Sequence, residues 1–317
     1  MKLPPEIRKR LQELNRGPLT FKEAPPSPPP AHPQGWGGEQ KDADPSSPSP
    51  SLGRGQGLGS NAAPSGSVEL NAVAPGEVVA SPFGNLYLIR KTAMAMLPHA
   101  SKLLDDYDAI FRGGSMSWRE SSLNRELRPL LDIDPERVLF LDIETTGLSA
   151  QPLFLIGVMH YGDGDLQVRQ ILARDYSEER AALAKLEEMI SHYEALVTFN
   201  GKSFDVPYIR ERGIANGVVL EFSGQHVDLL HEARRRWRGR LPNCKLQTLE
   251  RYLLKRVRSG DIPGELIPQA YHNFVLTGNA FQMADILHHN ALDLLAMSEL
   301  LVIMIKTNDE CGMMNDE

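Results

Sequence analysis

The sequence predicts an α/β fold, a mixed β-sheet flanked by helices, behind a disordered N-terminal tail. Apolar runs of strand length occur near 138–143, 153–161, 166–172 and 195–199. The first three follow one another closely, as hairpin-linked strands do, and “GDGD” at 162–165 predicts one of their turns. A helical pattern near 177–193 precedes the fourth run, and mostly helix follows it. Hairpins combined with crossover helices predict a mixed sheet with helices on its faces.

The composition is that of a globular protein. Of 317 residues, 41% are hydrophobic and 24% are charged, so one large domain or two small ones can bury a core. The formal net charge of -7 gives the whole molecule no attraction for a polyanion. Any contact with nucleic acid must therefore depend on a local basic surface.

The cysteines and the apolar segments indicate in which cellular compartment the protein is expected. Cys244 and Cys311 are far apart and outside any paired spacing, which argues against a disulfide framework or a zinc ribbon. The first residues carry positive charge with no apolar segment behind them, so no signal peptide is expected. The apolar run from Leu294 to Ile305 is too short to cross a bilayer and indicates a buried helix. We therefore expect a cytoplasmic protein without a membrane partner.

The chain divides into four predicted segments. Residues 1–66 hold 13 of the 23 prolines among many glycines and serines, which predicts a disordered tail. A short helix from Pro4 to Leu14 would be either a docking peptide for a protein partner or a frayed terminus. Residues 67–135 are predicted to be an accessory segment packed on the main domain, with a β-hairpin over 76–91. The main domain is 136–306, and 307–317 is a flexible C-terminus.

The stretch “VLFLDIETTGLSA”, Val138 to Ala150, ends a buried strand with two acids. Asp142 and Glu144 are two residues apart, so in a strand they project from the same face. Neighbouring carboxylates repel each other and lose hydration unless one is protonated, arginines pair with them, or they share a divalent cation. The cation explains best why only oxygen ligands are present, because Mg²⁺ and Mn²⁺ prefer carboxylates and water.

Two further acids occur later in the chain. Asp205 follows the strand in “ALVTFNGKSFDVPYI” and falls near the first turn of the next helix, where a helix cap and a ligand are equally good interpretations. Asp293 lies in “ILHHNALDLLAMSELL”, a largely buried helix, and a buried carboxylate needs a partner. His289 stands four residues before Asp293 and shares its helix face.

Taken together, the three segments resemble the DEDD exonucleases of the ribonuclease H-like superfamily. Their motifs are Asp-x-Glu, then Asn-x-x-x-aromatic-Asp, then an Asp preceded by His or Tyr. This sequence supplies them in the same order as Asp142, Glu144, Asn200, Phe204, Asp205 and Asp293. The segments “LFLDIETTGL”, “LVTFNGKSFDVP”, “ARRRWRGRLPNCKLQTLE”, “DIPGELIP” and “HNALD” look like the YprB-type ribonuclease H-like domain. The resemblance covers about residues 76–306.

The resemblance implies a 3′–5′ exonuclease that uses two Mg²⁺ or Mn²⁺ ions to activate a water and to stabilise the departing oxygen. Asp142 would bridge the ions, Glu144 and Asp293 would bind the ion that carries the water, and Asp205 would hold the second ion. His289 would orient or deprotonate the water. The residues 136–306 are then the exonuclease domain.

The family also divides by whether a His stands five residues before the last acid or a Tyr stands four before it. “HHNALD” puts His288 at the first spacing and His289 at the second. On an uninterrupted helix the residue four back lies beside Asp293, and the residue five back points away. We therefore predict that His289 is catalytic and that His288 is a surface or hydrogen-bonded side chain.

A basic stretch, “ARRRWRGR” at 233–240, places five arginines around Trp237. It would be either a phosphate-tracking patch or a solvated helix face paired with acids. We predict phosphate contact for the arginines and core packing for Trp237. Lys202, near Asp205, would touch either a phosphate or solvent. The predicted nucleic-acid-binding residues are Asn200, Lys202, Phe204, Arg235, Arg236 and Arg238.

The sequence thus predicts a metal-dependent nuclease that acts on a single-stranded end. DNA and RNA remain alternative substrates, as do end and internal cleavage. The alternative class is a nucleic-acid-binding module of the same fold with weak or lost hydrolysis, and a third is a scaffold that recruits partners through the tail. The intact acids favour the enzyme, and a metal-dependent assay on labelled single strands separates the first two classes.

Overall fold

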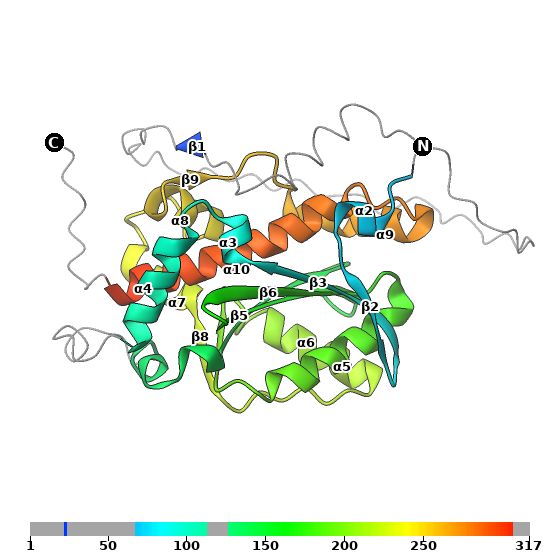
Figure 1. Cartoon of the computed structure of the whole chain (residues 1–317), viewed down its shortest axis with the longest axis horizontal. Helices are drawn as coiled ribbons and strands as arrows, with labels where there is room; N and C mark the ends of the chain where they lie inside the picture. Colours follow the sequence, from blue (N-terminus) through cyan, green and yellow to red (C-terminus); the bar gives the residue numbers. More distant parts are fainter. Residues whose placement is uncertain (1–21, 24–66, 113–125, 307–317) are drawn as a thin grey trace, which may run out of the picture.

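The computed structural model describes residues 22–23, 67–112 and 126–306 (Figure 1). Its centre is a 7-stranded sheet in the order β2-β3-β6-β5-β4-β7-β8. The strands are β2 (Glu77–Ser81), β3 (Gly84–Thr92), β4 (Val138–Thr145), β5 (Leu153–Gly162), β6 (Asp165–Leu172), β7 (Ala195–Thr198) and β8 (Gln225–Asp228). The predicted mixed sheet flanked by helices is confirmed.

The sheet contains both strand orientations. From β2 through to β4 every neighbouring pair is antiparallel. The pairs β4–β7 and β7–β8 are parallel. The β5–β6 hairpin turns at Asp163 and Gly164, which both have positive φ, where “GDGD” predicts a turn. The connection from β6 to β7 carries the predicted helix, α5 (Glu179–Ile190).

Helices cover both faces of the sheet (Figure 1). On one face lie α5 and α6 (Asp205–Asn216), and on the other lie α4 (Ala100–Arg112), α7 (Leu229–Trp237), α8 (Leu246–Leu253) and α10 (Met283–Lys306). The remaining helical segments are α2 (Leu70–Val73), α3 (Ala93–Met96), α9 (Ile267–Thr277), η1 (Arg128–Asp132), η2 (Pro135–Arg137), η3 (Tyr176–Glu178) and η4 (Gly264–Leu266).

The alternation of β4 decides which of its residues each helical layer covers. Leu139 and Leu141 pack with α5 and α6. Val138 and Phe140 pack with α4, α7 and α10. Trp237, at the end of α7, is buried in this second core, as predicted. The sheet therefore separates two apolar cores, one on each face.

α10 is the central helix of its layer and contains the buried helix that the sequence predicts (Figure 1). Among the residues that the structure describes, it is the one helix long and apolar enough to cross a membrane by length and composition. However, 78% of its apolar 18-residue stretch is buried inside the protein, as in the core helix of a globular domain.

The N-terminal hairpin is part of the same sheet. β2 and β3 form the hairpin predicted over 76–91, and β3 also pairs with β6. The predicted tail, its short helix and the C-terminal segment lie outside the described residues, apart from β1 (Lys22–Glu23), which pairs antiparallel with β9 (Arg256–Val257). β8 was not predicted. Its four residues, “QHVD”, are too few for a periodic pattern, and parallel pairing with β7 makes them a strand.

Candidate metal centre

Asp142 and Glu144 lie near the carboxyl end of β4 and continue the row of residues that faces α10. They are two and four positions after Phe140, which packs beneath that helix. β7 pairs with β4 only as far as Phe140, so the edge of β4 beside the two acids is free of a neighbouring strand in the described chain. Groups from other elements reach this edge.

Asp205 is one of these groups. It is the first residue of α6, and its carboxylate accepts the backbone N–H of Ile143, the residue between the two acids of β4. The cap position of α6 belongs to Phe204, whose side chain makes no capping hydrogen bond. The local structure therefore directs the Asp205 carboxylate to the edge of β4.

The turn before α6 requires a particular backbone. Asn200 has a φ of 69°, in the left-handed region that asparagine tolerates better than most residues. Gly201 packs so closely on Thr198 that a Cβ at this position would lie 2.4 Å from Thr198 Oγ1. These two residues allow the chain to leave β7 and enter α6 within a few residues.

Asp228 stabilises this turn, and the sequence analysis missed it. It is wholly buried at the end of β8 and accepts hydrogen bonds from three backbone N–H groups. The donors are Asn200 at 2.8 Å, Lys202 at 3.0 Å and Leu230 at 3.0 Å. One carboxylate thus orders the turn before α6 and caps α7. No local signal pointed to Asp228, because β8 itself was not predicted.

Asn290 of α10 holds Asp142. Its amide Nδ2 donates to Asp142 Oδ2 at 2.7 Å, and its Oδ1 accepts from Gln170 Nε2 at 2.9 Å. Gly157, which pairs with Asp142 across β4 and β5, makes room, because a Cβ there would lie 2.1 Å from Asn290 Oδ1. Asn290 stands inside the quoted “HNALD” but was given no role.

His289 and Asp293 lie one helical turn apart on α10. His289 Nε2 is 3.7 Å from Asp293 Oδ2, and His289 Nδ1 is 2.9 Å from Asp261 Oδ1. Burial lowers the pKa of His289, but the Asp261 hydrogen bond and the charges of Asp293 and Glu144 outweigh burial and raise it to about 9. His289 is therefore a cation at neutral pH. Asp261, which holds it, was missed by the sequence analysis.

The neighbouring His288 has a different environment. Burial, followed by the charge of Lys91, lowers its pKa to about 4, so that it stays neutral at physiological pH. The structure thus makes His289, and not His288, the histidine in an ion pair with Asp293.

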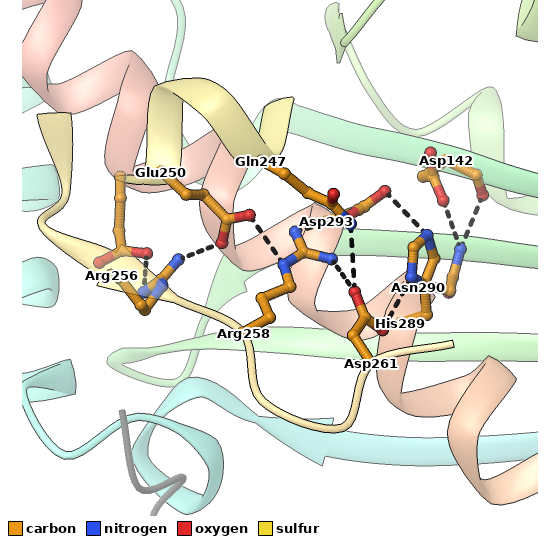
Figure 2. A network of polar contacts seen from close by, with 10 residues as sticks. Asp142, Gln247, Glu250, Arg256, Arg258, Asp261, His289, Asn290 and Asp293 are labelled. Carbon is orange, nitrogen blue, oxygen red and sulfur yellow. Dashed lines mark hydrogen bonds and ion pairs between the residues drawn. The ribbon is translucent and has the colours of Figure 1, made fainter. Parts of the chain in front are cut away.

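Arg258 joins Asp293 to a buried network (Figure 2). Its Nη2 is 2.5 Å from Asp293 Oδ1, its Nε donates to Glu250 Oε2 at 2.7 Å, and its Nη1 donates to Asp261 Oδ2 at 3.2 Å. Only 4% of the Arg258 side chain is exposed, so these ion pairs are shielded from water. Arg256 binds the other oxygen of Glu250 at 2.9 Å. The sequence analysis assigned no role to either arginine.

Burial and mutual repulsion raise the pKa values of the clustered acids. Burial is the main cause for Asp142, whose pKa lies well above its usual range, and the charges of Asp293, Glu144 and Asp205 raise it further. The pKa of Glu144 rises to about 8 and that of Asp205 to about 7, in both cases chiefly through burial. The predicted acids therefore act on one another from three elements, β4, α6 and α10.

The chemistry of this set suits a divalent cation. Its members are hard oxygen ligands, and Asp293 Oδ1 is buried without a hydrogen bond. In the present conformation, no group of three or more His, Cys, Asp or Glu side chains within 22–23, 67–112 and 126–306 is placed to hold a metal ion. Asp293 instead contacts Arg258.

The predicted phosphate-binding residues differ in what they contact. Arg235 and Arg236 both bind Glu232, a buried acid one turn earlier on α7. Lys202 Nζ is 3.1 Å from Glu126 Oε1. Carboxylates thus engage these three cations in the structure, and their contact with phosphate stays a prediction. The ring of Phe204 packs 5.4 Å from that of Tyr208 and contributes to the core below α6.

Arg238 is exposed and lies at a surface pocket. A pocket of about 480 Å³ is lined by Arg234, Arg238, Asn243 and Cys244 with their neighbours. Within the described residues, no ion pair engages Arg234 or Arg238. A second pocket of about 600 Å³ shares Pro242 and Asn243 with the first, and its lining includes Arg251, Tyr252, Arg258 and Asp261. The two adjoining pockets therefore extend to the residues that contact His289 and Asp293.

Comparison with known proteins gives concordant results. A family model described as RNase_H superfamily matches residues 139–305, more than half of the chain. The chain is 32% identical over 198 residues to a Bacillus subtilis protein named uncharacterized protein YprB. That match covers 60% of this chain and 46% of YprB, so the chain spans about half the length of this relative.

Two more distant matches are DNA polymerases. The chain is 31% identical over 99 residues to DNA polymerase 1 of Sulfolobus acidocaldarius, which covers 30% of this chain and 11% of the polymerase. Among solved structures, the family B DNA polymerase of Pyrobaculum calidifontis matches 52% of this chain and 24% of its own, with 18% identity and a TM-score of 0.41.

Proposed function

The chain belongs to the RNase_H superfamily, and on this premise we propose that it is a metal-dependent nuclease that hydrolyses phosphodiester bonds of nucleic acid. One observation carries the proposal, namely the buried carboxylates whose pKa values are raised by burial and by one another. Keeping such groups ionised at neutral pH requires positive charge nearby. Two Mg²⁺ or Mn²⁺ ions are the counter-charge that fits oxygen ligands alone.

The residues proposed to hold the ions are Asp142, Glu144, Asp205 and Asp293. Bound ions of this kind supply a polarised water and stabilise the leaving oxygen. The protein contributes rigid ligand positions. Asn290 fixes one oxygen of Asp142, and the backbone of Ile143 holds Asp205 at the edge of β4. These two ligands are thus held in place before an ion binds, whereas Asp293 contacts Arg258.

His289 acts in this proposal as an orienting cation. A group with a pKa of about 9 is protonated at neutral pH and cannot accept a proton there. Its Nδ1 is held by Asp261, which leaves Nε2 directed to Asp293. Neutralising Asp293 and Glu144 would remove two of the charges that raise this pKa, so the pKa of His289 would fall and more of the imidazole would be neutral and able to accept a proton.

The two adjoining pockets support a polyanionic substrate. Arg234, Arg238 and Arg251 line them, and all three are exposed. Arginines along a groove bind phosphates irrespective of sequence, and Tyr252 provides a ring on which a base can stack. We assign this surface to a single strand whose end enters the acidic centre. The order of the acidic motifs, which resembles that of DEDD exonucleases, supports 3′–5′ exonuclease action.

Product analysis tests the proposal. End-labelled DNA and RNA single strands are incubated with wild type and with Asp142→Asn, in Mn²⁺ and in EDTA. The expected result is mononucleotide release by wild type in Mn²⁺ alone and none by the variant. Equal degradation in EDTA would refute a metal-dependent reaction. Binding of the strands without hydrolysis in any metal would favour the alternative, a binding module of the same fold.

A further inference from the structure

The acidic centre contains its own positive charge. Arg258 enters from the segment after β9 and places Nη2 2.5 Å from Oδ1 of Asp293. Neither atom has a hydrogen bond of good geometry, although both are buried. The contact therefore depends on attraction between charges more than on the directional bond that an arginine usually makes with a carboxylate.

The guanidinium does not depend on Asp293 for its place. Glu250 of α8 and Asp261 also bind it, at 2.7 Å and 3.2 Å. These two acids have partners of their own, because Arg256 binds Glu250 at 2.9 Å and His289 binds Asp261 at 2.9 Å. Figure 2 shows Glu250, Asp261 and Asp293 around Arg258, and of these three acids Asp293 is the proposed metal ligand.

A fixed cation beside Asp293 opposes a second cation at the same carboxylate. Two like charges a few ångströms apart repel strongly where water is excluded, and only 4% of Arg258 and 17% of Asp293 are exposed. An ion that uses Asp293 must share the carboxylate with Arg258 or displace it.

We infer that Arg258 is an internal counter-cation of the acidic centre, which stabilises the metal-free protein and competes with divalent ions for Asp293. This inference rests on the proposed function, since it takes Asp293 as a ligand. On this inference, Asp293 exchanges its ion pair with Arg258 for a bond to the metal ion when the ion binds.

The test is the affinity for Mn²⁺ measured by calorimetry on the full chain, for wild type and for Arg258→Gln. In this variant Glu250 keeps Arg256 and Asp261 keeps His289 at 2.9 Å, whereas Asp293 loses its nearer counter-charge and keeps only His289 Nε2 at 3.7 Å among the contacts described. We expect the dissociation constant for Mn²⁺ to fall by about tenfold or more, because a unit charge next to the ion is removed. The melting temperature in EDTA should fall and should recover in Mn²⁺ to a greater extent than that of wild type.

Arg256→Gln is the matched control. Arg256 is equally buried and shares Glu250, but its second partner is Glu299, outside the acidic centre. In this variant Glu250 keeps Arg258 and Glu299 keeps His99. It should be destabilised to a similar extent, and its Mn²⁺ affinity should stay within about twofold of wild type, since a charge further from the ion contributes less.

The outcomes separate the inference from its premise. Unchanged or weaker Mn²⁺ affinity of a folded Arg258→Gln protein overturns the inference, and weaker affinity would make Arg258 a supporting residue instead. If Arg258→Gln does not fold, Arg258→Lys replaces it. A lysine cannot contact Glu250, Asp261 and Asp293 together as the guanidinium does, so tighter Mn²⁺ binding than that of wild type supports competition, and equal or weaker binding contradicts it. If Asp142→Asn binds Mn²⁺ as tightly as wild type, the proposed metal centre itself is wrong.

Discussion

The amide of Asn290 donates a 2.7 Å hydrogen bond to Asp142, a residue on β4 that lies far away in the sequence. Replacing Asn290 with Ala removes this donor and leaves a buried carboxylate oxygen without a partner. We expect a loss of about 1–3 kcal/mol in the free energy of unfolding, measured in urea without metal. The change also removes the bond from Gln170 Nε2 to Asn290 Oδ1, but Gln170 Nε2 still donates to the carbonyl of Leu287 at 2.7 Å, so the unpaired oxygen of Asp142 should account for most of the loss.

The matched control for this change is Asn273→Ala, at an exposed position of α9. Its free energy of unfolding should change by no more than about 0.5 kcal/mol. Equal stabilities of the two variants would show that the bond to Asp142 contributes nothing measurable.

Asp142→Asn should stabilise the metal-free protein. Asp142 is repelled by Asp293, Glu144 and Asp205, and the substitution removes one charge from this group while Asn290 can still donate to the new amide oxygen. We expect a gain of about 1–2 kcal/mol in EDTA at pH 8, since relieving one strongly raised carboxyl pKa is of this order. Asp163→Asn, in the exposed β5–β6 turn, should have no such effect. A lower melting temperature for Asp142→Asn in EDTA would contradict the repulsion.

Stability without metal should fall as the pH rises from 6.5 to 9. The folded-state pKa of Glu144 is raised from 4.5 to about 8 and that of Asp205 from 3.8 to about 7, so folding favours their protonated forms and this advantage is lost as each ionises. The pKa of His289 is raised from 6.5 to about 9, and its contribution is also lost toward pH 9. Melting temperatures in EDTA across this range should therefore decline, and excess Mg²⁺ should reduce the decline.

At the acid end, His226 and His288 should act in the opposite direction. Burial lowers both pKa values from 6.5 to about 4, so the folded protein binds fewer protons than the unfolded chain in this range and stability falls as the pH drops from 6.5 to 4. His226→Gln should reduce this part of the acid dependence. If the stability of the His226→Gln variant falls between pH 6.5 and 4 as steeply as that of wild type, His226 does not contribute to the acid dependence.

The two groups of arginines on and after α7 should respond differently to substitution. Arg234→Glu with Arg238→Glu should weaken binding of a labelled single strand and flatten the dependence of the binding constant on salt, because both residues line the open pocket. Arg236→Ala should instead lower stability, since Arg236 is 6% exposed and binds the buried Glu232. Fluorescence anisotropy at several salt concentrations and thermal melting measure the two effects.

Arg180→Glu is the control for the binding experiment. Arg180 is an exposed residue of α5 on the opposite face of the sheet, where it lies over the ring of Phe83. The Arg180→Glu substitution changes the net charge of the protein by the same amount as Arg234→Glu or Arg238→Glu alone. If it weakens binding equally per charge, the pockets have no special part in holding the strand.

Local patterns were sufficient for much of the fold and for the candidate acids. Alternation in a strand places Asp142 and Glu144 on one face, and the spacing of four residues places His289 beside Asp293 on α10. The strand alternation and the helical spacing are each properties of one strand or one helix, so they can be recognised without knowing which elements pack against it. β8 was missed because four residues carry no periodicity of their own.

The sequence by itself determined most of the strands and the buried helix, since each follows from the period of one element, and the resemblance to DEDD exonucleases grouped the four acids. Only the tertiary structure decided what surrounds those acids. Asn290 against Asp142, Arg258 on Asp293 and Asp261 on His289 join segments distant in the chain. A buried charged side chain must pair with a group of opposite charge or a hydrogen-bond partner. Many residues of the chain could supply such a partner. Which one does so depends on the packing of α8, α10 and the segment after β9 around the sheet edge.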